Sequence, residues 1–120
     1  MLQGGGDRAL FLKRSRDIEY AKKNGRRIST PFFNMMICPT DVSRSRIGIV
    51  VGKRFGGAVS RNRVKRLFRE LTRHVQGELI QGQSLVVFPK RDSIVQPFAV
   101  LKEAWLSILQ RQRLLRTHEN

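Results

Sequence analysis

The stretch KRFGGAVSRNRVKRLFRE, residues 53–70, carries the strongest signal in this 120-residue sequence. Two glycines, Gly56 and Gly57, precede a predicted helix over 58–76 in which only Glu70 opposes the cations. Those cations are Arg61, Arg63, Lys65, Arg66, Arg69 and Arg73. Like charges one helical turn apart destabilise a helix by roughly 0.2–0.5 kcal/mol per pair, so this crowding favours a polyanionic partner.

Phosphate is the anion that suits this helix best. Arginine offers a planar fork of donors to phosphate oxygens, and a helix N-terminus adds backbone N–H groups and a positive dipole. The alternative is a solvated surface helix with incidental charge, which six Lys/Arg within 13 residues against one acid disfavour. Asn62 could bond a sugar hydroxyl or a base edge, although a helix-capping role stays open for it.

The charge of the whole chain also indicates a polyanionic partner. The formal net charge is +15, from 24 Lys/Arg against 9 Asp/Glu, which implies nucleic acid or an anionic membrane surface as partner. No apolar run approaches the roughly 20 residues that span a bilayer, and no signal core follows Met1. A single cysteine, Cys38, excludes an internal disulfide, and we expect an inert thiol. These features predict a cytoplasmic protein with no membrane span and no obligate protein partner.

Apolar spacing predicts three helices, over 15–24, over 58–76 and from about Pro97 onward. Ser15 is the expected cap of the first helix, and Gly25 is its expected stop. The positions expected to face the core from the other two helices are Val64, Leu67, Phe68, Leu71, Val75, Phe98, Leu101, Trp105, Ile108 and Leu109.

Alternating apolar residues predict strands over 28–38 and 46–51, and a continuous apolar run predicts an interior strand over 84–89. The expected fold is an α+β sandwich, a small mixed sheet with three helices in the order α-β-β-β-α-β-α. The expected organisation is a disordered arm over 1–9, a single RNA-binding domain over 10–112 and a basic tail over 113–120.

The two faces of strand 28–38 differ in character. The face expected to meet the core carries Phe33, Met35 and Ile37. The other face carries Phe32, Asn34, Met36 and Cys38. We expect Phe32 to be exposed and able to stack on unpaired bases, with Pro31 marking an edge, a bulge or the strand's beginning. On strand 46–51, Gly48 leaves room for either a closely packed helix or a ligand.

Two further basic groups accompany the central helix. The first, in the N-terminal region, comprises Lys13, Arg14, Arg16, Lys22, Lys23, Arg26 and Arg27. The second is Lys90 with Arg91. Several patches on so small a body suggest a partner that wraps it or two separate nucleic-acid strands, and we expect patches on opposite faces.

The search for catalytic residues is negative. The acids are scattered, no Ser/His/Asp arrangement is evident, and no carboxylate pair suggests a two-metal site. His74 is expected to be a surface or half-buried residue. Tyr20 and Phe55 are further candidates for base stacking, whereas core packing is expected for Phe68, Phe88, Phe98 and Trp105. Neither catalytic nor metal-ligating residues are therefore predicted.

The run from Arg46 to Glu70 resembles the protein subunit of bacterial ribonuclease P. That family carries a strand, a Lys-Lys/Arg-x-Gly-x-Ala-Val turn, and then Arg-Asn-x-x-Lys-Arg-x-x-Arg on a helix. The matching residues here are Gly48-Ile49-Val50-Val51, Lys53-Arg54, Gly56, Ala58-Val59, Arg61-Asn62, Lys65-Arg66 and Arg69. The apolar strand near 85–88, the following Lys90-Arg91 and the closing amphipathic helix fit as well.

The resemblance implies an α/β sandwich with a left-handed βαβ crossover, against the usual right-handed preference. It also implies a ribonucleoprotein endonuclease, a hydrolase in which a large RNA, using Mg²⁺, removes the 5′ leader of precursor tRNA. The protein would be an accessory component that binds ribonuclease P RNA and precursor tRNA. It would not itself be catalytic and would bind no cofactor tightly.

Carried over residue by residue, the resemblance implies two binding sites. The RNA subunit would be contacted by Lys53, Arg54, Arg61, Asn62, Arg63, Lys65, Arg66 and Arg69. The leader cleft, between the first helix and the sheet, would be lined by Ile18, Lys22, Phe32, Asn34 and Met36, with Lys90 and Arg91 nearby. The family often has aromatic rings where this chain has Ile18 and Lys22, so Lys22 could instead hold a leader phosphate.

Two other classes of protein share part of this pattern. A structural RNA-binding protein, such as a small ribosomal protein, fits the composition but not the patterned glycine turn and helix. A helix-turn-helix DNA binder would need a short helix packed before the basic one, and the strand-like residues 46–51 occupy that place.

Overall fold

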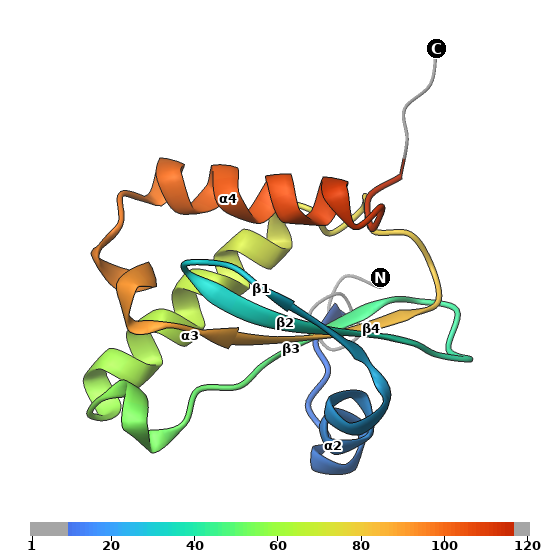
Figure 1. Ribbon diagram of the computed structural model, residues 1–120, viewed down its shortest axis with the longest axis horizontal. Coiled ribbons are helices and arrows are strands. Elements are labelled where there is room, and N and C mark those ends of the chain that lie inside the picture. Colours follow the sequence, from blue (N-terminus) through green and yellow to red (C-terminus); the bar gives the residue numbers. More distant parts are fainter. Residues whose placement is uncertain (1–9, 117–120) are drawn as a thin grey trace, which may run out of the picture.

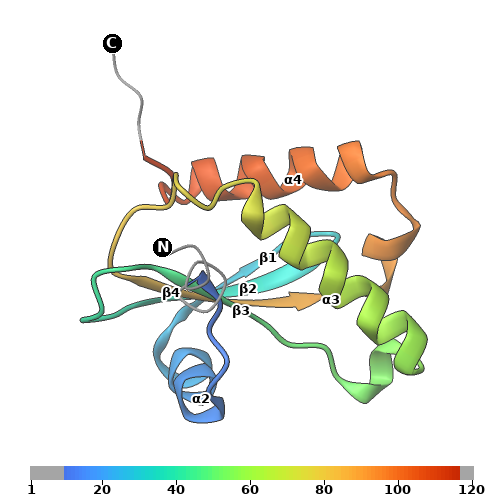
Figure 2. The same cartoon turned by 180° about the vertical axis from the view of Figure 1, so that it is seen from behind.

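The computed structural model describes residues 10–116 and arranges them in three layers (Figure 1). The helix α2 covers one face of the sheet, and the helices α3 and α4 cover the other (Figure 2). The helices are α2 (Ser15–Asn24), α3 (Ala58–Arg73) and α4 (Phe98–Arg111). The strands and 3₁₀ turns are β1 (Arg26–Ser29), β2 (Phe33–Pro39), β3 (Arg46–Ile49), η1 (Lys53–Phe55), β4 (Gln83–Pro89) and η2 (Arg91–Val95). This is the predicted α+β sandwich, with its elements in the predicted order.

The strand β4 lies inside the sheet, whose strand order is β1-β2-β4-β3. It pairs antiparallel with β2 and parallel with β3. Leu85, Val86 and Val87 are fully buried, which confirms the prediction of a strand covered on both faces. The connection from β3 through α3 to β4 therefore joins two neighbouring parallel strands, and its left-handedness stays a prediction of the resemblance.

The predicted strand over 28–38 is in fact a hairpin of β1 and β2, joined by a turn at 30–32. Thr30 closes this turn: its hydroxyl donates to the Phe33 carbonyl at 2.6 Å and accepts the Phe33 N–H at 3.0 Å. Pro31 has no N–H to give to a sheet ladder and lies in the turn, where none is needed. The split explains why alternation holds from Phe33 onward but not before it.

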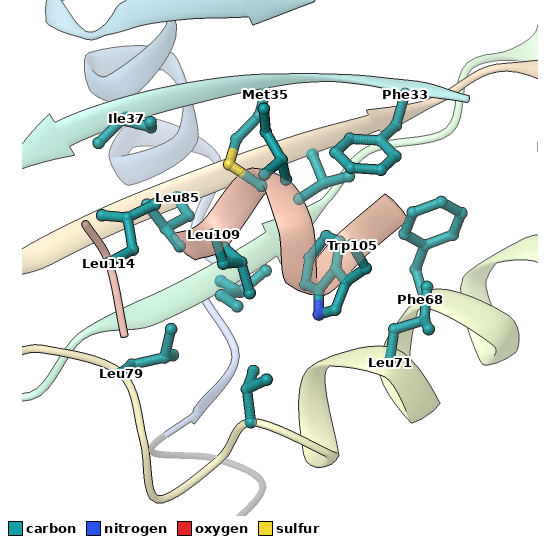
Figure 3. Packing of buried hydrophobic residues seen from close by; sticks show 14 of the residues in the cluster. Phe33, Met35, Ile37, Phe68, Leu71, Leu79, Leu85, Trp105, Leu109 and Leu114 are labelled. Carbon is teal, nitrogen blue, oxygen red and sulfur yellow. The ribbon is translucent and has the colours of Figure 1, made fainter. Parts of the chain in front are cut away.

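The main core lies between the sheet and the helices α3 and α4 (Figure 3). Phe33, Phe68 and Trp105 meet edge to face there, with ring centroids 5.5–6.0 Å apart. Such pairs contribute about 0.5–1.5 kcal/mol each beyond the burial of their area. The predicted core stripe of α3 is confirmed, because Val64, Phe68, Leu71 and Val75 are buried and Leu67 packs against the same cluster.

One residue predicted for the core of α4 lies outside it. Phe98 is 38% exposed, although Leu101, Trp105 and Leu109 further along the helix are fully buried. It is the first residue of α4, and its ring lies 5.9 Å from the His74 ring beside the end of α3. The apolar spacing is therefore correct for α4, but its first turn extends past the edge of the core.

The ends of the elements also differ slightly from expectation. The helix α2 begins after Arg14, and Ser15 is its first residue without capping it through its side chain. The helix α3 ends at Arg73, because the chain continues in three-residue turns such as that from Val75 N–H to the Thr72 carbonyl (3.0 Å). The strand β3 ends at Ile49, two residues earlier than predicted.

Two glycines let α2 lie close to the sheet. A Cβ at Gly25 would come within 2.6 Å of the Ala21 carbonyl oxygen and 2.9 Å of that of Ile37. A Cβ at Gly48 would lie 3.1 Å from the Leu12 carbonyl oxygen and 3.5 Å from Ile18 Cγ1. The space at Gly48 thus serves close packing of α2 and of the segment before it, which was one of the two predicted uses.

The packed chain extends past residue 112, where the domain was expected to end. Leu114 is buried, and Leu115 forms a bridge with Leu79. The Ile80 N–H donates to the Leu114 carbonyl at 2.8 Å. The predicted arm over 1–9 lies outside the described residues, as does the end of the predicted tail from residue 117.

Candidate nucleic-acid interface

The cations of α3 begin at a glycine turn that the backbone requires. Gly56 has φ +153°, a conformation that residues with a Cβ rarely adopt. The Arg61 guanidinium donates to the Gly56 carbonyl at 2.7 Å and so fixes this turn to the second turn of the helix. Gly57 caps α3 without a side chain, which leaves the first backbone N–H groups of the helix for other acceptors.

The residues predicted to contact an RNA subunit lie on η1 and along the side of α3 that faces away from the core, and we call them the α3 patch. Its members are Lys53, Arg54, Arg61, Asn62, Arg63, Lys65, Arg66 and Arg69. Arg61 and Lys65 are half-buried and the other members are exposed. Within residues 10–116, no ion pair neutralises any cation of this patch. The α3 patch is therefore a dense positive surface without internal compensation.

Asn62 belongs to this surface and does not cap the helix. The residue at the cap position is Gly57, and Asn62 is exposed in the second turn of α3. The capping alternative for Asn62 is therefore wrong. Its amide is free to face the same partner as the arginines on either side of it.

A second surface lies on the other side of the sheet, under α2. Ile18, Met36 and Phe88 are half-buried there, and they pack around a small cluster of Leu12, Ala21, Cys38 and Val86. Asn34 pairs with Phe88 across the β2–β4 ladder, so both side chains lie on this face. The ammonium of Lys22 lies 5.9 Å from the centre of the Phe88 ring. We call this surface, Ile18, Lys22, Asn34, Met36 and Phe88, the α2 patch.

Phe88, for which the sequence predicts core packing, is half-buried and packs against the smaller hydrophobic cluster on this face. It belongs to the continuous apolar run of β4, in which alternation between the two faces is hidden because both are covered. The register with β2 reveals its face, since Phe88 pairs with Asn34 and Val86 with Met36. Ser29 of β1 is not among the predicted site residues, yet it contacts one of them: its hydroxyl donates to the Asn34 side-chain oxygen at 2.8 Å.

Phe32, predicted to be exposed beside α2, is not part of this patch. It is half-buried and packs against the main core on the opposite face of the sheet. Its carbonyl accepts the Lys90 N–H at 2.9 Å, and the Lys90 ammonium donates to the Thr30 carbonyl at 2.7 Å. Lys90 thus fixes the β1–β2 turn, while Arg91 next to it is exposed in η2. The turn at 30–32 moves Phe32 out of the strand alternation on which its prediction rested.

The helices α2 and α3, which carry members of the two patches, lie on opposite faces of the sheet (Figure 1, Figure 2). A hollow of about 170 Å³ lies between them at the outer edge of β3, lined in part by Lys13, Ile18 and Arg69. The two remaining candidates for base stacking differ in exposure. Tyr20 is 62% exposed, whereas Phe55 is buried.

Within residues 10–116, no three His, Cys, Asp or Glu side chains come together in a way that could hold a metal ion. His74 is exposed, as predicted, and its Nε2 lies 3.6 Å from a carboxylate oxygen of Glu70. No helix in this part of the chain is long and apolar enough to cross a membrane. The fold is an α+β sandwich, and its uncompensated cationic surface is typical of a nucleic-acid-binding protein.

Comparison with known proteins identifies the particular family. A family model described as Ribonuclease P matches residues 7–113. The ribonuclease P protein component of Herpetosiphon aurantiacus is 31% identical over 112 residues, which cover 93% of this chain and 91% of that one. That of Caldanaerobacter subterraneus is 34% identical, over 90% of this chain and 93% of that one. The chain belongs to the ribonuclease P protein family.

Solved structures agree with this assignment. The ribonuclease P protein of Thermotoga maritima superposes with a TM-score of 0.75 at 30% identity, covering 84% of this chain and 96% of that one. A mutant ribonuclease P protein of Staphylococcus aureus superposes with a TM-score of 0.83 at 21% identity, covering 93% and 95%, and supports the fold alone. The chain is thus an accessory protein component of ribonuclease P, which works with the ribonuclease P RNA in processing the tRNA 5′ leader.

Proposed function

We propose that the protein holds two different RNA strands, one on each side of its sheet. The α3 patch binds the ribonuclease P RNA, and the α2 patch binds the single-stranded 5′ leader of precursor tRNA. The observation that carries this proposal is the placement of two chemically different surfaces on opposite faces of one small sheet.

The α3 patch suits the phosphates of a folded RNA. Its guanidinium groups can hold phosphate oxygens bidentately, and the first turn of α3 offers backbone N–H groups to the same partner. Because no acid within residues 10–116 pairs with these cations, binding of polyanionic RNA relieves their mutual repulsion. The glycine turn that Arg61 fixes sets the position of Lys53 and Arg54 beside the helix.

The α2 patch suits a flexible single strand. Phe88 and Met36 give a half-exposed apolar floor on which a base can stack, and Asn34 beside them offers an amide to a base edge. Lys22 stands above Phe88 and can hold a leader phosphate. Phe88 therefore takes the stacking role that Phe32 was expected to have. Lys90 and Arg91 add positive charge near the β1–β2 turn, so they extend the path of the strand.

The protein's contribution is to bind and orient the two RNAs, while the RNA subunit carries out hydrolysis. The Mg²⁺ that this chemistry uses is held by the RNA subunit. Binding of the leader by the α2 patch raises the affinity for substrate, and positive charge next to the RNA lowers the Mg²⁺ concentration required. We place this activity in the cytoplasm.

A reconstitution experiment tests the proposal. The purified protein is combined with a bacterial ribonuclease P RNA and precursor tRNA at low Mg²⁺ concentration, with each component alone as control. We expect leader removal only when protein and RNA subunit are both present. Cleavage by the protein alone would contradict an accessory role, and no stimulation of the RNA would favour a structural RNA-binding protein instead.

A further inference from the structure

A hollow of about 400 Å³ lies beside the α3 patch, between α3 and the segment that leads into α4. Its α3 side is formed by Arg63, Arg66, Leu67 and Glu70, and its other side by Ile94, Gln96 and Phe98. Two of these residues, Arg63 and Arg66, are already members of the α3 patch. The hollow therefore continues that surface toward α4.

The hollow exposes apolar side chains that phosphate binding does not require. Phe98 is 38% exposed, and Val95 and Val100, close to it in the chain, are 73% and 42% exposed. Single exposed apolar residues are ordinary, but Phe98 lines the hollow together with Leu67 and Ile94, and apolar side chains gathered around a hollow mark a binding surface. The Phe98 ring also rests against His74, with centroids 5.9 Å apart, so it has a fixed aromatic neighbour.

The charges around the hollow indicate which kind of ligand it takes. Glu70 is the acid on its lining, and this carboxylate lies 3.9 Å from Arg73 and 3.6 Å from His74. Arg63 and Arg66 pair with no acid within residues 10–116 and stay available to an anion. An apolar, aromatic wall next to two free guanidinium groups matches an unpaired nucleotide, whose base stacks while its phosphates meet the cations.

We propose that this hollow receives one unpaired nucleobase of the ribonuclease P RNA, which stacks on Phe98 while Arg63 and Arg66 hold the adjoining phosphates. This inference rests on the proposed function, because it extends the α3 patch that binds the same RNA. The α3 patch then combines two kinds of contact, phosphate contacts along the helix and one base contact at its side.

The test is Phe98→Ala, measured as the affinity of the protein for the ribonuclease P RNA over a range of salt concentrations. Stacking on one aromatic ring is worth about 1–3 kcal/mol, so we expect a roughly 5- to 150-fold loss of affinity. The slope of log affinity against log salt should not change, since every phosphate-binding cation is kept. Phe98→Tyr, which keeps the ring, should bind like the wild type.

Two controls separate stacking from loss of structure. Phe98→Leu keeps apolar volume without a ring, and we expect it to fold and still to lose most of the affinity. Tyr20→Ala removes the other strongly exposed aromatic ring, on α2, and should leave affinity for the RNA subunit unchanged. Chemical probing of the bound RNA should show one unpaired base that the wild type protects and that Phe98→Leu leaves reactive.

The outcomes distinguish this inference from the proposed function. If Phe98→Leu binds like the wild type while Arg66→Ala with Arg69→Ala binds weakly, the base site is overturned and the α3 patch stands. If neither variant changes binding, the proposed function itself fails. If the wild type sediments as a dimer and Phe98→Leu as a monomer with unchanged RNA affinity, the hollow is a contact between two protein copies and the inference is overturned.

Discussion

The α3 patch and the α2 patch expose different kinds of side chain. The first is rich in guanidinium groups that no acid within residues 10–116 compensates, and the second is a half-buried apolar floor with one ammonium group above it. Guanidinium groups fit the closely spaced phosphates of a folded RNA, whereas an apolar floor needs bases that are free to unstack. Under the proposed function, each side of this sheet is therefore adapted to a different state of RNA, structured on one side and single-stranded on the other.

Of the substitutions that compare the two patches, the largest effect should come from removing two cations of the α3 patch. Each phosphate that is no longer neutralised lowers the salt slope by about 0.7–0.9, which at 0.1 M salt means a roughly 25- to 60-fold weaker complex for two phosphates. We therefore expect this loss of affinity for Arg66→Ala with Arg69→Ala when binding to the ribonuclease P RNA is measured by salt titration. An unchanged slope would remove both residues from the interface. The preference for leader-bearing substrate over mature tRNA should stay as in the wild type.

A smaller effect is expected on the other side of the sheet, from Phe88→Ala. Loss of one stacked base should weaken holoenzyme binding of precursor tRNA roughly 5- to 30-fold, corresponding to about 1–2 kcal/mol, with little change for mature tRNA. Phe32→Ala is the matched control, because Phe32 is also half-buried but packs on the opposite face. Equal losses for precursor and mature tRNA in the Phe88 variant would mean that Phe88 is only a packing residue.

The smallest effect should come from Lys22→Ala. One phosphate contact to a single strand contributes a slope of about 0.7, which is roughly fivefold in affinity at 0.1 M salt. We expect this reduction for leader-bearing substrate, with the salt slope reduced accordingly. Lys23→Ala changes an exposed neighbour of equal charge and serves as control. Identical losses in the two variants would show that general positive charge, and no defined phosphate contact, acts on the leader.

The two patches differ in how well the sequence predicts them, because one lies on neighbouring residues and the other on elements distant in sequence. The members of the α3 patch lie on one helix and the turn before it, so helical spacing alone places them together. The α2 patch joins one helix to strands that are distant in sequence, so its membership depends on the register of β2 and β4. No local pattern gives that register, so the sequence alone does not show on which face of the sheet Phe88 lies.

The errors at Phe32 and Phe98 have a related cause. In both cases the periodic pattern is extended to a residue at the boundary of an element, where it no longer determines burial. Phe32 precedes β2 and lies in the turn that Thr30 closes, and Phe98 begins α4 beyond the edge of the core. Spacing identifies the interior of an element well, but the three-dimensional turn or edge decides where its first residue points.

The most direct test of two separate RNA surfaces is a double-mutant cycle that combines Arg66→Ala and Arg69→Ala with Phe88→Ala. The quantity measured is the affinity of assembled holoenzyme for precursor tRNA, at protein concentrations that saturate the RNA subunit for every variant. We predict that the free-energy changes add to within about 0.5 kcal/mol, as they do for distant, independent sites. Coupling well above that value would contradict the account, because it would mean that one continuous RNA strand occupies both patches.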